Sequence, residues 1–540
     1  MTKSLSLILH IISHITLFVE VFILKKFIFL KNAIILTITS FILRFLGMVL
    51  RIYMSNNIGA EGMGLYQLIL SIYVMASTFA TAGVSTAVIK IISDELISGS
   101  KISVNRALKK SMIISFSFGI TSTILIFILA NPIGKYVLHD TRTIPALKIL
   151  VLAFPFMSIT SCLKGYFLAT KNVSTPSNAQ LFEQIVRILL IFFLLKSFSH
   201  LGITVCCVII MISDVIAESC SCLYSFWRYF IYRKTIKTNH LIRKNKERIL
   251  KKFFSVAIPV AGTRYVNSFL HTIENILVPN KLRTFHSSHE KALEEFGIIK
   301  GMAIPLLFFP ASFITAISTL LLPEMSEAYE LHHKEKIRYL TEKTLKLTII
   351  SSILISGLFF TFSFEISEVI YKNTQVGHII KMLAPIVPFM YIESMIMGLL
   401  QGLNQQMSSL KYIITDSIIR IILIFFLVPT KGLEGFIYIM IISNIYTSCS
   451  NLYKLLKVSN AKIDFKNWIL KPLFSLLSGN IVLLYFNKIF NLSTISYLIF
   501  GIIIISISYI LGIFISHAIK ISELKSSTTD SHNYFCIKHI

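Results

Sequence analysis

Two segments of this chain place an acidic residue four positions before an arginine and follow the pair with a run of isoleucine, leucine and phenylalanine. The first pair is Glu183 and Arg187, and the second, 233 residues further on, is Asp416 and Arg420. Residues four apart lie on one face of a helix, so each pair can neutralise its own charges. Apolar runs of this length indicate membrane-spanning helices. Charges inside them are costly, so they are expected to have a functional or structural role.

The same offset relates other parts of the chain. The matched positions are Ser85 and Ser318, Asp94 and Glu327, Pro155 and Pro388, and Gly165 and Gly398. An internal repeat of this length within apolar sequence is typical of transporters that are built from two lobes.

The composition also indicates a polytopic membrane protein in which all regular structure is α-helical. The chain has 540 residues, of which 54% are hydrophobic and only 14% are charged, against about 25% in soluble proteins. The formal net charge of +26 is concentrated in short loops. Cytoplasmic loops and anionic lipid head groups explain such charges better than nucleic acid does.

A membrane-spanning helix needs about 20 apolar residues, and the sequence predicts fourteen such spans. They are 33–53, 65–89, 110–130, 144–167, 179–196, 203–226, 253–278, 298–322, 345–364, 380–402, 408–428, 433–453, 468–487 and 494–517.

The repeat divides these spans into two lobes of six helices. Six is an even number, so the two copies have the same orientation and a cavity is expected between them. We expect an N-terminal lobe at 32–228, a basic cytoplasmic loop at 229–252 and a C-terminal lobe at 253–454. Residues 455–518 supply two helices outside the repeat, and residues 519–540 form a polar cytoplasmic tail. Residues 1–31 are an N-terminal extension, which is either an extra apolar anchor or the result of a start codon assigned too early.

Loop charges predict the orientation in the membrane. The loop at 228–252 carries ten lysines and arginines and one acid, and 90–110, 324–346 and 454–471 are also basic, whereas 54–64 contains no lysine or arginine. Basic loops stay in the cytoplasm. We therefore expect a multi-pass protein of the cell membrane, with both ends of the fourteen-helix unit in the cytoplasm.

Three arginines in the expected spans have no acid four residues away. They are Arg44 and Arg51, which share a helix face, and Arg264. An unpaired arginine at this depth costs roughly 2.5–3.5 kcal/mol, and its planar guanidinium suits phosphate oxygens. These residues predict a cationic cavity that binds an anionic substrate, although Arg51 could instead reach the membrane surface.

Acidic residues form a second group of candidates. The pairs Glu183–Arg187 and Asp416–Arg420 could act as structural clamps or take part in transport. Asp214, Glu218, Glu274 and Glu393 also lie in expected spans, and they are candidates for coupling transport to a cation gradient.

Prolines within the spans predict bends next to a cavity or hinge, at Pro155, Pro259 and Pro388 in particular. The sequence contains no HExxH or GxSxG motif, and its seven cysteines include no CxxC pair or cysteine–histidine cluster with metal spacing. We expect no catalytic residue, no metal site and no cofactor.

Several motifs together resemble a known family, that of stage V sporulation protein B and related polysaccharide biosynthesis proteins. The similarity extends over about residues 27–520. It rests on the motifs at 44–47 (RFLG), 58–66 (IGAEGMGLY), 164–167 (KGYF), 183–187 (EQIVR), 258–265 (IPVAGTRY), 310–314 (PASFI), 322–327 (LPEMSE) and 400–404 (LQGLN).

This resemblance implies membership of the multidrug/oligosaccharidyl-lipid/polysaccharide (MOP) exporter superfamily, which includes lipid II flippases. It implies two rocking lobes around a cationic cavity for a pyrophosphate-sugar head group, and a groove for the polyprenyl tail at the last two helices. Arg44, Arg51 and Arg264 lie on the equivalent helices. The implied substrate is a polyprenyl-linked oligosaccharide, such as a precursor of spore cortex peptidoglycan. Membrane lipids and cell-wall synthesis proteins are the other expected partners.

Three other functions remain open from the sequence. A cation-coupled drug exporter of the same fold would use the intramembrane acids. An outer-leaflet glycosyltransferase would need acid pairs in an outer loop, for which Glu294 and Glu295 are candidates. A scaffold for a wall-synthesis complex would tolerate changes to the arginines of the cavity.

Overall fold

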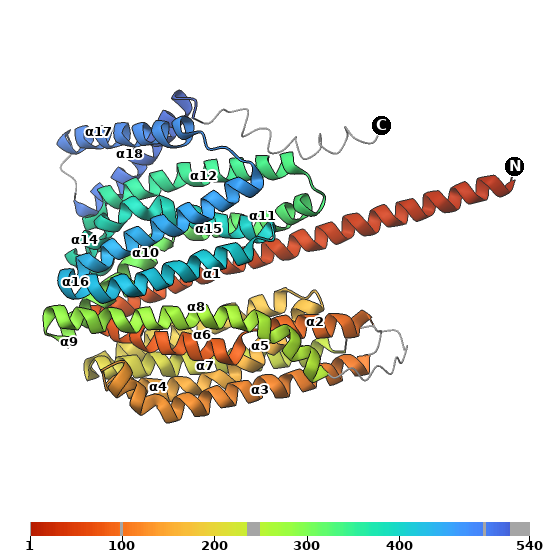
Figure 1. Cartoon of the computed structure of the whole chain (residues 1–540), viewed down its shortest axis with the longest axis horizontal. Coiled ribbons are helices and arrows are strands. Elements are labelled where there is room, and N and C mark those ends of the chain that lie inside the picture. Colours follow the sequence, from red (N-terminus) through yellow and green to blue (C-terminus); the bar gives the residue numbers. More distant parts are fainter. Residues whose placement is uncertain (1, 98–100, 235–248, 490–492, 519–540) are drawn as a thin grey trace.

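The computed structural model describes residues 2–97, 101–234, 249–489 and 493–518, and every regular element within these ranges is a helix. Most helices run roughly along the long axis of the molecule (Figure 1). The expected tail at 519–540 and most of the expected loop at 229–252 lie outside the described residues.

The first half of the chain forms one group of helices. These are α1 (Thr2–Thr81), α2 (Val84–Ile97), α3 (Lys101–Pro132), α4 (Thr143–Leu150), α5 (Phe154–Ala169), α6 (Ser174–Phe198) and α7 (Ile203–Tyr232), with a π-helix η1 (Ile133–Val137) and 3₁₀ turns η2 (Val151–Ala153) and η3 (Ser199–Leu201). The first part of α1 extends away from the other helices toward the N-terminus (Figure 1), and α1 passes without a break through the apolar run of the N-terminal extension.

The second half forms the other group. Its helices are α8 (Ile249–His286), α9 (His289–Phe296), α10 (Ile304–Phe308), α11 (Ala311–Glu330), α12 (Lys334–Thr361), α13 (Ser363–Tyr371), α14 (Thr374–Leu383), α15 (Val387–Gly402), α16 (Gln406–Ser459), α17 (Lys471–Ile489) and α18 (Thr494–Ile515). Between them lie the π-helices η4 (Gly297–Ala303) and η6 (Lys466–Leu470) and the 3₁₀ turn η5 (Ala384–Ile386).

Each of the fourteen expected spans lies mainly on helix. Within the described residues, nine helices are long and apolar enough to span a membrane, or ten if a bent pair counts as one span. Two of the nine, α1 and α16, exceed the length of a single crossing and are broken at Gly59 (φ 69°) and Gly432 (φ 57°), where a positive φ favours glycine. The charged helices α6 and α8 are outside this count, so the number of crossings stays a prediction.

Figure 1 shows the two groups one above the other, with α1 and α8 between them. The groups meet where α1 packs against α11 and where α8 packs against α2. The helices α17 and α18 pack against each other and against α12, at the edge of the second group. The all-α fold with two lobes and two additional helices is therefore the one that the sequence predicted.

Packing at the matched positions confirms the repeat. A Cβ atom on Gly165 of α5 would lie 2.7 Å from the backbone oxygen of Ser85 on α2, and one on Gly398 of α15 would collide with the side-chain hydroxyl of the matched residue, Ser318 of α11. The prolines match as well, because Pro155 follows η2 at the start of α5 and Pro388 follows η5 at the start of α15. Each lobe thus uses a glycine to bring two helices into close contact, α2 and α5 in the first lobe and the equivalent α11 and α15 in the second.

This contact makes a testable prediction. Gly165→Ala should destabilise the protein by about 1–3 kcal/mol, because the new methyl group has no room beside α2. The control is Gly47→Ala, since nothing lies within 4 Å of a Cβ atom there. Thermal unfolding in detergent measures both variants, and an equal or higher unfolding temperature for Gly165→Ala would contradict the packing argument.

Candidate functional site

A cavity of about 580 Å³ lies between α1, α2, α5, α6, α7 and α8. Each of these helices contributes at least one polar or charged side chain to the wall, and the wall includes charges of both signs. The charged lining residues are Lys164, Glu183, Arg187, Glu218 and Arg264, and the neutral polar ones are Thr81, Ser85, Thr86, Thr160, Ser161, Gln180, Gln184 and Ser225. Charged and hydroxyl-bearing walls at this depth suit a polar head group rather than an apolar molecule.

Arg187 is the centre of an ion-pair cluster on one wall of this cavity. Its Nη2 donates to Oε1 of Glu183 at 2.8 Å, and its Nε donates to Oδ1 of Asp214 on α7 at 2.6 Å. Its Nη1 donates to Oε1 of Gln184 at 2.8 Å. All three guanidinium nitrogens therefore have partners, and the cluster joins α6 to α7.

Arg420 has the equivalent role in the C-terminal lobe. It lies 3.2 Å from Asp416 and 3.3 Å from Glu274 on α8. Oε1 of Glu274 also accepts a hydrogen bond from Nζ of Lys300 at 2.9 Å. Two acids are thus balanced by two cations, and the cluster joins α16, α8 and the π-helix η4.

The two clusters place their acids differently. Asp214 of α7 corresponds by the offset of 233 to Thr447, which donates to Glu393 of α15 at 3.0 Å, whereas Glu393 corresponds to Thr160. The first lobe therefore places an acid on α7 where the second has a threonine, and the second lobe places an acid on α15 where the first has a threonine. The candidate acid Glu218 lines the cavity, and its side chain lies against that of Glu183.

The three candidate arginines do not share one cavity in this conformation. Arg264 of α8 lines the cavity. Arg44 instead donates from Nη1 to Oγ1 of Thr315 on α11 at 2.8 Å, and Arg51 lies near Tyr66 and Tyr371. The sequence therefore grouped three residues that the structure separates.

Lysines were missed by the sequence reasoning. Lys164 was noticed only as part of a motif, yet it lines the cavity together with Arg264. Lys300 lies in an expected span and pairs with Glu274. Applying the argument about charges in apolar spans to lysine as well as to arginine would have found both.

The candidate hinges lie at helix joints or within a helix. Pro155 and Pro388 occupy the two equivalent joints between a 3₁₀ turn and an α-helix, whereas Pro259 lies inside α8. Movement about them stays a prediction.

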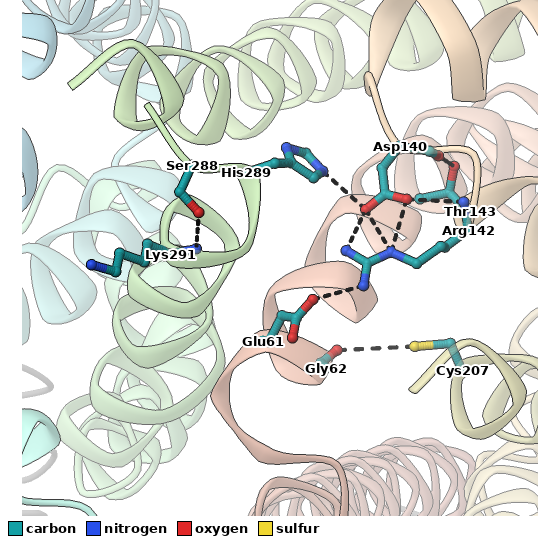
Figure 2. Close-up of polar contacts among 9 residues, drawn as sticks. All are labelled: Glu61, Gly62, Asp140, Arg142, Thr143, Cys207, Ser288, His289 and Lys291. Carbon is teal, nitrogen blue, oxygen red and sulfur yellow. Dashed lines mark hydrogen bonds and ion pairs between the residues drawn. The ribbon is translucent and has the colours of Figure 1, made fainter. Parts of the chain in front are cut away.

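A polar cluster joins the two lobes at the end of the bundle that carries Gly59 (Figure 2). Arg142, which follows the turn after η1, contacts Glu61 of α1 at 2.7 Å and Asp140 at 2.8 Å. Oδ2 of Asp140 also lies 3.0 Å from Nε2 of His289 at the start of α9. We call these four residues the Gly59-end latch. Glu61 lies in the motif at 58–66, but the sequence does not indicate its connection to the other three residues.

The carboxyl group of Asp140 stays charged in this latch. Burial by itself would raise the pKa of Asp140, but hydrogen bonds with His289 and Arg142 outweigh burial and hold the pKa well below its usual range. A carboxyl group with a lowered pKa stabilises the folded state above its ordinary pKa of about 3.9. This stabilisation is lost only when the pH falls through the lowered value, so Asp140 supports the latch throughout the neutral range.

Backbone contacts close the same end. A Cβ atom on Gly297 would collide with the backbone of Ala60 and Gly64, and one on Gly64 would collide with Leu293. Only glycine allows α1 to approach α9 and η4 this closely. The lobes are therefore in direct contact at the Gly59 end.

Toward the opposite end of the bundle, α8 contacts both α1 and α2. Nζ of Lys252 on α8 lies 2.8 Å from Oδ2 of Asp94 on α2. The ring of Phe79 on α1 stacks on that of Tyr265 on α8, with the centroids 6.0 Å apart.

Metal binding finds no support among the residues that the structure describes. No group of three or more histidine, cysteine, aspartate or glutamate side chains is arranged there to hold a metal ion.

Comparison with protein families decides the membership of the chain. The family described as polysaccharide biosynthesis protein matches residues 29–329, which is more than half of the chain. The chain belongs to this polysaccharide biosynthesis protein family. The match includes the cavity, the Gly59-end latch and the Arg187 cluster.

Similar proteins of this type are known in Bacillus subtilis (strain 168). Stage V sporulation protein B is 27% identical over 447 residues, which are 82% of this chain and 86% of that protein. Sporulation protein YkvU is 22% identical over 66% of this chain and 78% of its own length. Lipid II flippase MurJ is 21% identical over 73% of this chain and 76% of its own length.

Solved structures show the same fold. The lipid II flippase MurJ in an inward closed conformation has a TM-score of 0.62 at 16% identity and covers 89% of this chain and 98% of that chain. An inward-facing multidrug resistance MATE transporter of the MOP superfamily also has a TM-score of 0.62, at 15% identity, over 78% of this chain and 94% of that one. This member of the polysaccharide biosynthesis family therefore has the MOP transporter fold. The names of these proteins describe a flippase and a transporter, which agrees with the expectation that the chain is not an enzyme.

The Arg187 cluster predicts a large effect on stability. Arg187→Met should lower the free energy of unfolding by about 3–5 kcal/mol, because it leaves Glu183 and Asp214 without their cation. Lys196→Met is the control, since Lys196 lies exposed on the same helix. Thermal unfolding in detergent compares them, and unfolding temperatures within one degree of each other would show that the cluster is not a clamp.

The Gly59-end latch predicts a local effect. Asp140→Asn should increase amide hydrogen exchange at the start of α9 about tenfold or more, because hydrogen bonds to charged groups contribute about 1.5–3 kcal/mol. Exchange is followed by mass spectrometry, with Glu290→Gln as the control because Glu290 is exposed on α9. Equal protection in the two variants would mean that the latch does not hold the lobes together.

Proposed function

We propose that this protein is a flippase that moves a polyprenyl-diphosphate-linked cell-wall precursor from the inner to the outer leaflet by alternating access. The observation that carries the proposal is the presence of Lys164 and Arg264 in one cavity, neither of them in an ion pair with any described residue. Lys164 is half-buried and Arg264 is exposed, so both charges are available to bind an anionic group of the substrate in the cavity.

The chemistry of a diphosphate fits this wall. Arg264 offers a planar fork of N–H donors and Lys164 a compact ammonium group, and both bind phosphate oxygens. The hydroxyl and amide groups of the cavity can replace the water around a sugar. No bond is broken during such transport, so no catalytic residue is required.

The Gly59 end is proposed to face outward, as the loop charges predict. In that orientation the Gly59-end latch closes the outer side, and the cavity receives its substrate from the inner leaflet. Rocking of the two lobes would then break the latch and expose the head group on the other side.

The polyprenyl tail is proposed to lie along α17 and α18. Apolar side chains cover the exposed surface of these helices, including Phe474, Leu477, Ile481, Leu484, Ile499, Ile503 and Ile507. Lipid chains can follow such a surface while the head group crosses inside the protein.

Cation-coupled drug export is a second candidate, because Glu183 and Glu218 line the same cavity. The two functions differ in what they require of Arg264, since a site for cationic drugs does not need an unpaired arginine. The glycosyltransferase alternative receives less support, because Glu295 already pairs with His286 at 2.9 Å.

The test is flippase activity in cells depleted of their own lipid II flippase, with an external enzyme that cleaves only outer-leaflet lipid II. The chain should restore cleavage, and Arg264→Glu should reduce it at least tenfold, because it places an anion where the diphosphate binds. Lys109→Glu is the control at an exposed lysine of α3.

Two outcomes would contradict this assignment. Full activity of Arg264→Glu would remove Arg264 from the binding site. Efflux of cationic drugs driven by a proton or sodium gradient, with no cleavage of lipid II by a well-inserted wild-type protein, would favour the drug exporter.

A further inference from the structure

The cavity contains more than a site for a phosphate. Resting on the proposed function, we propose that it selects a head group that carries a free amine as well as a phosphate, and that Glu218 together with Glu183 binds the amine. The phosphate would bind to Lys164 and Arg264, so that a doubly charged head group spans the cavity.

The charges of the cavity and of the adjoining Arg187 cluster, taken together, are balanced in number but not in pairs. Asp214, Glu183 and Glu218 supply three acids, and Arg187, Lys164 and Arg264 supply three cations. Arg187 takes two of the acids, whereas Lys164 on α5 and Arg264 on α8 form no ion pair with the described residues. The unpaired cations and the remaining acid therefore come from different helices around the same space.

Glu218 is the acid that lacks a cation. Its residue is only 7% exposed, and its carboxyl group lies against that of Glu183. Arg187 attracts Glu218 electrostatically, but each of its nitrogens already donates to Asp214, Gln184 or Glu183. Two adjacent carboxylates in a low-dielectric wall need a proton or a cation between them.

An ammonium group is the cation that this wall suits. It has three N–H donors, and Thr160 on α5 supplies a hydroxyl group to the same cavity. Oγ1 of Thr160 is buried without a hydrogen-bond partner. A metal ion suits the wall less well, because no group of three or more potential ligands is present in the described parts of the chain.

Such a site would discriminate strongly. Acetylation of the amine removes its positive charge, so the two carboxylates would remain buried without a counter-ion. Sites that are built to bind a polar group reject analogues that lack it far more strongly than apolar pockets reject a change of size.

The test uses the purified full-length protein in lipid nanodiscs and two soluble probes. Both are uridine-diphosphate sugars joined to a short lysine-containing peptide, one with the lysine amine free and one with it acetylated. Isothermal titration calorimetry should show at least tenfold tighter binding of the free amine by the wild type. Glu218→Gln should bring the ratio of the two dissociation constants close to one, whereas Glu330→Gln, at an exposed acid of α11, should keep it.

The outcomes separate the two proposals. Equal binding of both probes by the wild type, or discrimination that persists in Glu218→Gln, overturns the amine site and leaves the flippase proposal standing. If neither probe binds, or if Lys164→Gln and Arg264→Gln bind both as tightly as the wild type, the phosphate site fails and the amine site fails with it.

Discussion

The structure depends on an arginine shared between acids of two different helices, once in each lobe. A charge inside a membrane needs a partner, and a single i,i+4 pair would only make one helix neutral. Because Arg187 also reaches Asp214, and Arg420 also reaches Glu274, the same interaction neutralises the helix and fixes it to its neighbour. The lobes can then pack around small residues at their helix crossings, where glycine allows contact at short distance.

Much of this architecture could be predicted from the sequence, because membrane helices leave a strong local signal. Apolar length gave the helices, the offset of 233 gave the repeat, and Gly165 and Gly398 occupy equivalent crossings. The breaks at Gly59 and Gly432 lie between expected spans. The count of crossings stays a prediction, because charged helices such as α6 and α8 do not reach the apolarity of the nine spanning helices in the described residues.

The site was harder to predict, since side chains from distant parts of the chain compose it. The i,i+4 pairs were visible in the sequence. Nothing there indicates that Arg187 also pairs with Asp214, or that Arg420 and Lys300 share Glu274. Arg44, Arg51 and Arg264 share a residue type and a depth, yet they point to different neighbours. Glu61 is connected to His289 through Arg142 and Asp140. This connection joins α1, the turn before α4 and the start of α9, and pairings between segments so far apart are not encoded in local pattern.

The difference between the two ion-pair clusters has a consequence for the working of the lobes. In the C-terminal lobe a lysine of the chain itself provides the second cation, so the charge of that cluster is set by covalently attached groups. In the N-terminal lobe the cluster faces an open cavity, and Glu218 has no such tethered counter-ion. One lobe therefore has a fixed electrical state, whereas the electrical state of the other depends on what occupies the space beside it.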